Sequence, residues 1–195
     1  MKKVRKPVKL VKLDLACGND CKAGFEGVEI VKCPGVVHQV DLLKFPWPFR
    51  DESVEEINCS HFVEHIPMQD INDPYGSGMK DMFFMFFDEV YRILIPNGRA
   101  VIACPWYASV RAWQDPTHRR AISDVTFAYL NKGWREQVNI AHYNVGCDFD
   151  YTPSYVVQQS FAVRHEEQRA FAMNHYMNAI VDINVVLVKR GTNGR

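Results

Sequence analysis

The chain has 195 residues, 47% of them hydrophobic, and its acidic and basic side chains balance to a formal net charge of zero. This length and composition suit one globular domain with a full core, and the zero charge disfavours attraction to nucleic acid or an acidic membrane through a global field. No apolar run is long enough to cross a bilayer, and the start lacks the apolar core of a secretory signal, so a cytoplasmic protein is expected.

The predicted elements alternate between strands and helices, which is typical of an α/β fold. Apolar segments predict strands at 9–15, 27–30, 36–40, 54–59, 99–104 and 180–188. Between the fourth and fifth strands, apolar side chains recur at three- and four-residue spacing from Met82 to Leu94, which predicts a helix that Pro96-Asn97-Gly98 ends. Another helix is expected over 166–177.

The first two strands lie unusually close together in the sequence. Residues 16–26 separate them, close to the minimum length for a parallel crossover. The helix that normally follows the first strand of such a fold is therefore expected to be a single turn or missing.

Residues 105–160 are rich in aromatic and charged side chains and only weakly periodic. We expect this segment to be a lid or a substrate-binding insertion within a single domain that covers 1–195.

The six cysteines form no recognisable metal-binding pattern. The sequence has no C-x-x-C pair, and no His/Cys cluster has the spacing of a zinc site. Reduced, partly buried thiols and no metal ion are expected.

The first strand ends in an acid, small residues and a turn, Asp14-Leu15-Ala16-Cys17-Gly18. Small residues at the carboxyl end of a buried strand leave room for a ligand, and Asp14 can accept hydrogen bonds from an amine. A dinucleotide-binding turn reads G-x-G-x-x-G, so its absence counts against a nicotinamide-dependent oxidoreductase. The plain alternative is a strand-to-loop junction without a ligand.

Acids also follow the next two strands, at Glu29 and Asp41. The carboxyl ends of parallel strands lie along one edge of a sheet, where ligands bind. Glu29 is placed to accept from two ribose hydroxyls, and Asp41 from an exocyclic adenine amine. Three acids without a basic cluster disfavour a pyrophosphate and suit a sulfonium with an ammonium group.

Three further stretches carry a resemblance to a known family. They are Leu42-Leu43-Lys44-Phe45-Pro46-Trp47-Pro48-Phe49-Arg50-Asp51-Glu52-Ser53-Val54-Glu55-Glu56-Ile57, Ser60-His61-Phe62-Val63-Glu64-His65-Ile66-Pro67 and Phe87-Asp88-Glu89-Val90-Tyr91-Arg92-Ile93-Leu94-Ile95-Pro96-Asn97-Gly98. Together with the first motif, and in the same order, they resemble class I S-adenosylmethionine-dependent methyltransferases over residues 10–105. Ala16 stands where that family has the first glycine of its acid-x-Gly-x-Gly motif.

The resemblance implies a Rossmann-like fold with a mostly parallel sheet of about seven strands, an antiparallel last strand and, here, a shortened first helix. It also implies S-adenosylmethionine as the cofactor. The implied contacts are Asp14, Ala16, Cys17 and Gly18 for the methionine moiety, Glu29 for the ribose, Asp41 and Leu42 for the adenine, and Ser60 and His61 beside the sulfonium.

The same resemblance places the run from Asp115 to Arg119 on the substrate side. His118 is the first candidate for a general base and His61 the second, because a histidine of near-neutral pKa can take a proton from the methyl acceptor. The candidate substrate residues are Trp106, Asp115, His118 and Arg119. Asp115 could equally begin a turn or cap a helix, and either histidine could be structural; Glu64 and His65 are expected to hold the loop after the fourth strand.

The sequence therefore predicts a methyltransferase that acts on an O or N atom of a small-molecule or glycan-type substrate. Amino-group methylases of DNA bases or glutamine carry an N/D-P-P-Y-type motif where this chain has Ser60-His61-Phe62-Val63, which disfavours nucleic acid as the substrate. The alternative is a catalytically inactive cofactor-binding scaffold or subunit, favoured by the short first crossover and Ala16. That alternative gains support if His118 and Asp115 lie far from the cofactor site. No feature of the sequence indicates the oligomeric state.

Overall fold

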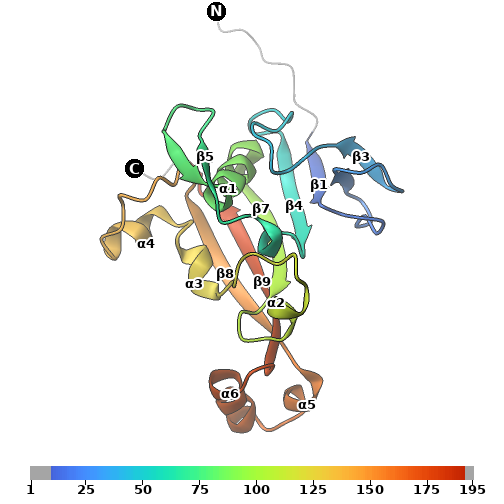
Figure 1. Ribbon diagram of the computed structural model, residues 1–195, viewed down its shortest axis with the longest axis vertical. Coiled ribbons are helices and arrows are strands. Elements are labelled where there is room, and N and C mark those ends of the chain that lie inside the picture. The colour runs from blue at the N-terminus through green and yellow to red at the C-terminus, as the bar shows by residue number, and fades with distance from the viewer. Residues whose placement is uncertain (1–9, 192–195) are drawn as a thin grey trace, which may run out of the picture.

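The computed structural model describes residues 10–191, and its main feature is one seven-stranded sheet (Figure 1). The strand order is β3-β2-β1-β4-β7-β9-β8. The strands are β1 (Val11–Leu15), β2 (Glu26–Glu29), β3 (Val36–Gln39), β4 (Val54–Ser60), β7 (Leu94–Pro105), β8 (Phe149–Val157) and β9 (Ile180–Lys189). The strands from β3 to β7 pair in parallel, whereas β9 runs antiparallel to both β7 and β8. The predicted α/β sheet with an antiparallel last strand is thus confirmed.

Most helices are short. The longer ones are α1 (Met82–Ile93) and α6 (Glu166–His175), and the others are η1 (Val63–His65), α2 (Arg111–Gln114), α3 (Asp124–Ala128), α4 (Lys132–Gln137) and α5 (Gln159–Ala162). A small hairpin of β5 (Asp70–Asn72) and β6 (Met79–Asp81) leads into α1. Within residues 10–191, no helix is both long and apolar enough to cross a membrane.

Helix α1 begins and ends for local reasons. The carboxylate of Asp81 accepts a hydrogen bond from the backbone N–H of Phe83 and so caps the first turn. The helix ends at Ile93, and β7 starts at Leu94, so Pro96-Asn97-Gly98 does not end the helix as expected. These three residues instead lie where the pairing register between β4 and β7 shifts, with Asn97 at a φ of 64°.

The expected loss of the first helix is also confirmed. Residues 16–25, all of which the structure describes, form turns and no helix between β1 and β2. Two of these turns are closed by the N–H of Asp20 on the carbonyl of Cys17 and the N–H of Phe25 on the carbonyl of Lys22. The physical cause is chain length, because so few residues can return to a parallel strand only by a direct route.

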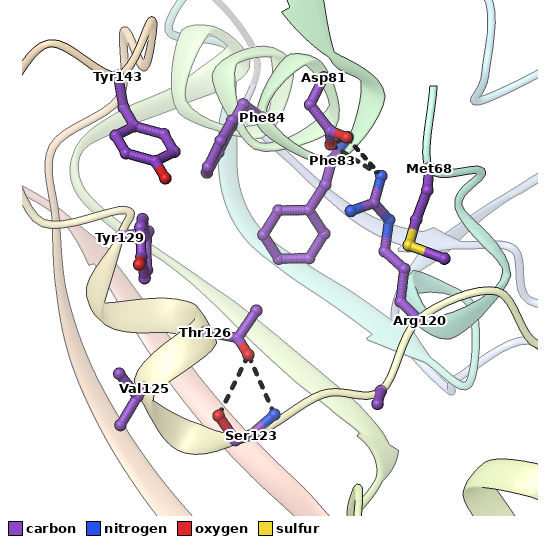
Figure 2. A pocket seen from close by; sticks show the side chains of 11 residues that line it. Met68, Asp81, Phe83, Phe84, Arg120, Ser123, Val125, Thr126, Tyr129 and Tyr143 are labelled. Atoms are coloured by element: carbon purple, nitrogen blue, oxygen red, sulfur yellow. Dashed lines mark hydrogen bonds and ion pairs between the residues drawn. The ribbon is translucent and has the colours of Figure 1, made fainter. Parts of the chain in front are cut away.

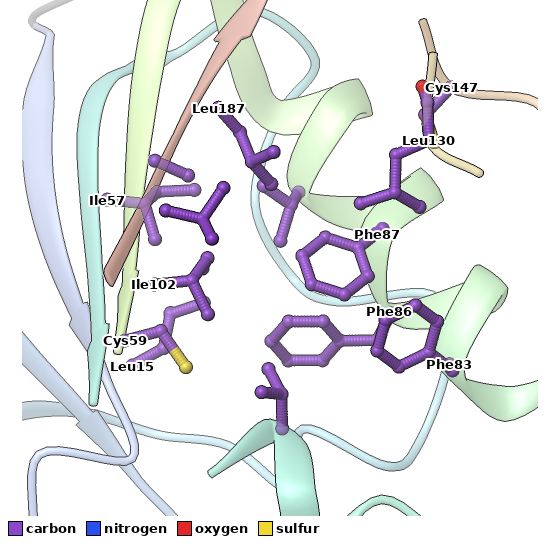
Figure 3. Close-up of a cluster of buried hydrophobic side chains, with 14 of the residues drawn as sticks. Leu15, Ile57, Cys59, Phe83, Phe86, Phe87, Ile102, Leu130, Cys147 and Leu187 are labelled. Carbon is purple, nitrogen blue, oxygen red and sulfur yellow. The ribbon is translucent and has the colours of Figure 1, made fainter. Parts of the chain in front are cut away.

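The hydrophobic core lies between one face of the sheet and α1 (Figure 3). Phe86 and Phe87 of α1 are fully buried, with ring centroids 5.2 Å apart. They face alternate side chains of the sheet, namely Leu13, Leu15, Ile57, Ile102, Ile183, Val185 and Leu187. Burying a side chain of this size contributes about 1.5–3 kcal/mol, so this face contributes substantially to the stability of the fold.

The segment 105–160 differs from its prediction at its end. Residues 149–157, expected in the insertion, form the edge strand β8 and pair antiparallel with β9. Its side chains alternate between half-buried and exposed from Asp150 onward, and Pro153 is tolerated because β8 lies at the sheet edge. Only residues 106–148, which hold α2 to α4, remain as the insertion. The helix expected over 166–177 is present as α6.

Candidate functional site

The loop after β1 turns sharply at the carboxyl edge of the sheet. Ala16 and Gly18 have φ angles of 53° and 55°, in the left-handed region that favours glycine. An alanine in this region costs roughly 1 kcal/mol, so Ala16 is a strained substitute for glycine. No described atom lies within 4 Å of a Cβ placed on Gly18, so there is open space beside this residue.

Asp14 is buried, with 4% of its surface exposed, and it holds this loop in place. Its Oδ2 accepts from the backbone N–H of Lys22 at 2.7 Å, and its Oδ1 accepts from the Asn58 amide at 2.6 Å. Asp14 therefore joins the loop to β4. A carboxylate oxygen has more than one acceptor direction, so a ligand amine can still bind the same group.

Glu29 fixes the other side of the loop. Its Oε2 accepts from the N–H of Gly18 at 3.1 Å, and its Oε1 accepts from the N–H of Ile30 at 2.7 Å. The structure thus brings two predicted cofactor residues, Glu29 and Gly18, into direct contact.

Asp41 and Leu42 form a separate turn after β3. Asp41 Oδ1 accepts from the N–H of Leu43 at 3.0 Å, and Asp41 Oδ2 lies 3.3 Å from Lys44 Nζ. Leu42 is 4% exposed, and its carbonyl accepts from the indole N–H of Trp47. These contacts give the turn a fixed shape with one apolar and one acidic side chain.

The thiols in this region are not acidic. Burial, together with the nearby Cys21 and Asp14, raises the pKa of Cys17 to about 11. Cys17 is therefore a protonated thiol at neutral pH, and it is not a nucleophile candidate.

The end of β4 carries Ser60 and His61, both exposed. The N–H of His61 donates to the carbonyl of Ala103 at 2.8 Å, which places His61 beside the end of β7. His61 Nδ1 lies 3.3 Å from Glu64 Oε1, and this carboxylate raises the pKa of His61 despite partial burial.

The segment that contains Asp115 and His118 packs against η1, directly after β4. The backbone N–H groups of Arg119 and Arg120 donate to the carbonyl of Glu64 at 2.7 and 3.1 Å. His118 Nε2 lies 4.0 Å from Glu64 Oε1 and 4.0 Å from Asp115 Oδ2. His118 and Asp115 therefore lie close to the end of β4, which does not favour the inactive-scaffold alternative.

Two residues that were expected only to hold a loop also belong to this cluster. Glu64 is 1% exposed, and the ring of His65 lies 4.7 Å from that of His118. The sequence did not indicate that Glu64 and His65 lie next to His118, because His118 is more than fifty residues away from them in the sequence.

Of the remaining substrate candidates, Trp106 lines a cavity, and Arg119 is not among the residues that line it. The Trp106 cavity has a volume of about 590 Å³, and its wall includes Tyr107, Asp124, Tyr155 and Asn174. Tyr155 Oη donates to Asp124 Oδ2 at 2.7 Å. The side chain of Arg119 is exposed and donates to the carbonyl of Pro116.

A neighbouring cavity was not expected from the sequence (Figure 2). It has a volume of about 450 Å³ and shares Ala121, Ser123 and Val125 with the Trp106 cavity. Its wall consists of Phe83, Phe84, Tyr129 and Tyr143 together with the ion pair of Arg120 and Asp81. The aromatic residues come from α1 and the insertion, so no single segment signals this cavity.

The sequence matches no protein-family model and no curated protein. The fold, in contrast, is similar to several solved structures. An S-adenosylmethionine-dependent methyltransferase from Archaeoglobus fulgidus is 20% identical, with a TM-score of 0.61 over 93% of this chain and 86% of that chain. The YcgJ protein from Bacillus subtilis is 14% identical, with a TM-score of 0.54 over 94% of this chain and 93% of that chain.

An S-adenosylmethionine-dependent methyltransferase from Mesorhizobium loti is 13% identical, with a TM-score of 0.51 over 93% of this chain and 92% of that chain. At these identities the likeness concerns the arrangement of the chain, and it agrees with the strand order described above. The chain therefore has the Rossmann-like fold of class I S-adenosylmethionine-dependent methyltransferases.

Proposed function

We propose that this chain is an S-adenosylmethionine-dependent methyltransferase that transfers a methyl group to an O or N atom of a small-molecule or glycan-type acceptor. One observation supports this most strongly. In a fold shared with such enzymes, Asp14 and Glu29 converge on the single loop that follows β1, one through Lys22 and the other through Gly18.

The residues present fit the cofactor. The open space beside Gly18 accommodates a ligand close to the backbone, and Asp14 offers acceptors for an ammonium group. Glu29 lies one strand further along the edge, where it can bind a ribose diol, and Leu42 with Asp41 offers an apolar and an acidic contact for an adenine. When bound, S-adenosylmethionine supplies a methyl group on a positively charged sulfur, which is already a good leaving group.

The chain itself has to position the acceptor and remove its proton. Two histidines are our candidates for proton removal. His118 Nδ1 lies 3.1 Å from the carbonyl of Ala112, which leaves Nε2 as the basic nitrogen. His61 lies at the end of β4 with its ring half exposed.

The acceptor site that we favour is the Trp106 cavity. Trp106 follows directly after β7, and the cavity combines aromatic faces with hydrogen-bonding groups from Asp124, Tyr155 and Asn174. A concave site with apolar walls and a few polar groups is typical for a small molecule. Asp115 and Arg119 do not line this cavity, so they would contact only a part of the acceptor that extends beyond it toward the segment after α2.

An inactive cofactor-binding scaffold is the second candidate. The observation in its favour is the direct crossover at residues 16–25, because this segment contains no helix whose N-terminus could bind part of the cofactor. Binding without transfer to any acceptor would distinguish it from the enzyme.

The cofactor site can be tested by calorimetric titration with S-adenosylmethionine and S-adenosylhomocysteine. We expect binding in the micromolar range, and we expect Glu29→Ala to weaken it about ten- to a hundredfold through lost hydrogen bonds to the ribose. Glu55→Ala is the matched control, because its carboxylate is 43% exposed on β4 and should leave binding unchanged.

Asp14→Ala should weaken binding as well, but it removes two internal hydrogen bonds, so its fold must be checked by circular dichroism. Failure of the folded, unmodified chain to bind either ligand would disprove the cofactor assignment.

A further inference from the structure

We propose that Glu64, His65 and His118 bind a divalent transition-metal ion. One potential ligand atom from each residue lies within 4.8 Å of the other two. Glu64 and His65 belong to η1, and His118 belongs to the segment that packs on it. This differs from the expectation of no metal ion, which considered only ligands close together in sequence.

Glu64 provides the first argument. Its side chain is 1% exposed, and neither carboxylate oxygen has a hydrogen-bond partner among residues 10–191. The nearest nitrogens are His61 Nδ1 at 3.3 Å and His118 Nε2 at 4.0 Å from Oε1. When protonated, His61 is an ion-pair partner of Oε1, but Oε2 still has no partner among residues 10–191, and a cation between Glu64 and the histidines would supply the contact that a buried carboxylate needs.

The second argument concerns the protonation of His118. Its Nδ1 lies 3.1 Å from the carbonyl oxygen of Ala112, which can only accept, so Nδ1 carries the proton. The lone pair is therefore on Nε2, the atom that faces Glu64 and Asp115. A backbone carbonyl that fixes the tautomer in this way is typical of metal-binding histidines.

The same reasoning applies to His65. The hydroxyl of Thr117 donates to Asp115 Oδ1 at 2.7 Å, so its oxygen is left to accept from His65 Nδ1 at 3.0 Å. This leaves the lone pair of His65 on Nε2. Asp115 and Thr117 thus form a second layer around the site and orient His65. This gives Asp115 a role other than the substrate contact that the sequence predicted.

The ligand set indicates which ion would bind. Two imidazole nitrogens and one carboxylate oxygen favour Zn²⁺ or Co²⁺ over Mg²⁺ and Ca²⁺, which prefer oxygen ligands. Ligand atoms about 2.1 Å from a tetrahedral ion lie about 3.4 Å from each other. The 4.0 Å between His118 Nε2 and Glu64 Oε1 is close to this, so small side-chain rotations suffice.

A consequence follows for the acceptor, and it rests on the proposed function. Three protein ligands leave a coordination position open, as in catalytic zinc sites, and such a position favours an acceptor with a hydroxyl group. His118 would then hold the ion instead of acting as the base.

The site can be tested with the untagged, chelator-treated chain in the absence of S-adenosylmethionine. Calorimetry with Zn²⁺ and the visible absorption of added Co²⁺ should show one equivalent bound, with micromolar or tighter affinity, and no binding of Mg²⁺. We expect His118→Gln and Glu64→Gln to weaken Zn²⁺ binding at least about a hundredfold. His142→Gln is the control, because His142 is exposed and lies outside the cluster.

Thr117→Val tests the orienting contact, because it leaves all three ligands present and should weaken Zn²⁺ binding about tenfold. Circular dichroism establishes that each variant is folded. Absence of stoichiometric binding by the folded, unmodified chain would overturn the site, and so would binding that persists in His118→Gln, which would be an adventitious surface ion. Because no methyl donor is present, neither result bears on cofactor binding.

Discussion

Lys80 is buried between two carboxylates, and this contact joins three parts of the chain. Its Nζ lies 3.0 Å from Asp73 Oδ2 and 2.6 Å from Asp88 Oδ2, and its side chain is 5% exposed. Asp88 belongs to α1 and also accepts from the N–H groups of Gly146 and Cys147. The ion cluster therefore ties the β5–β6 hairpin to α1 and to the segment that leads into β8.

Replacing Lys80 should be strongly destabilising at neutral pH. We expect Lys80→Met to lower the free energy of unfolding by about 3–5 kcal/mol, because two buried carboxylates lose their cation. Urea unfolding at pH 7 measures this, and Lys44→Met is the control because the Lys44 side chain is 84% exposed. An equally small effect of both substitutions would contradict a stabilising role for the cluster.

The pH dependence of this effect follows from Asp73. Burial alone would raise the pKa of Asp73, but hydrogen bonds from Ser77 and Tyr75 and the charge of Lys80 outweigh it, so this pKa lies below its usual 3.8. Because the pKa of Asp73 is lower in the native state than in the unfolded state, its ionised form stabilises the fold above the unfolded-state pKa. This stabilisation is lost as the pH falls through the native-state pKa. The difference between Lys80→Met and the unmodified chain should therefore shrink below about pH 4.

At the scale of elements, the loop that stands in place of the first helix packs closely against the backbone of β2. A Cβ on Gly27 of β2 would lie 2.6 Å from the carbonyl oxygen of Gly35 and 2.8 Å from Cys17 Sγ. The loop after β1 and the loop before β3 therefore meet over the bare backbone of β2. A glycine is needed here for close approach, and its own φ is not positive.

Gly27→Ala should test this packing. We expect it to destabilise the chain by about 1–3 kcal/mol, because backbone has to move to make room. Gly133→Ala in α4 is the matched control, since its Cβ would meet nothing closer than 3.5 Å, and it should be neutral or stabilising by up to about 1 kcal/mol. Thermal unfolding of the two variants compares them directly, and equal midpoints would show that the loops give way easily.

At the scale of the whole molecule, we expect the insertion, residues 106–148, to fold as one unit with the sheet. The last strand, β9, lies between β7 and β8, so both ends of the insertion enter strands of the same sheet. Phe127 and Leu130 from the insertion also belong to the core that α1 and the sheet form.

We therefore expect one cooperative unfolding transition. Circular dichroism and tryptophan fluorescence should give the same midpoint in urea, because Trp47 lies in the core and Trp134 lies in α4 of the insertion. Hydrogen exchange should likewise show α4 and β7 opening together in the global event. An earlier transition of the insertion alone would mean that it is a separate unit.

The fold was predictable from the sequence to a large extent. Hydrophobic periodicity indicated β1, β2, β4, β7, β9 and α1 because each contributes buried side chains to the core, whereas β3 was indicated by its valines although it buries no side chain there. The loss of the first helix followed from chain length alone. Strand β8 was missed because its exposed edge weakens the apolar alternation and Pro153 is unusual in a strand.

The sequence by itself thus determined six strands of the large sheet, the longest helix and the acids at the carboxyl edge of the sheet, since these depend on residues that are neighbours along the chain. The tertiary structure alone decided which polar groups meet. Asp14 binds Asn58, Lys80 lies between Asp73 and Asp88, and His118 faces Glu64 only because distant segments cross there. Such contacts depend on how the strands are ordered and where the insertion returns, and no local pattern encodes that.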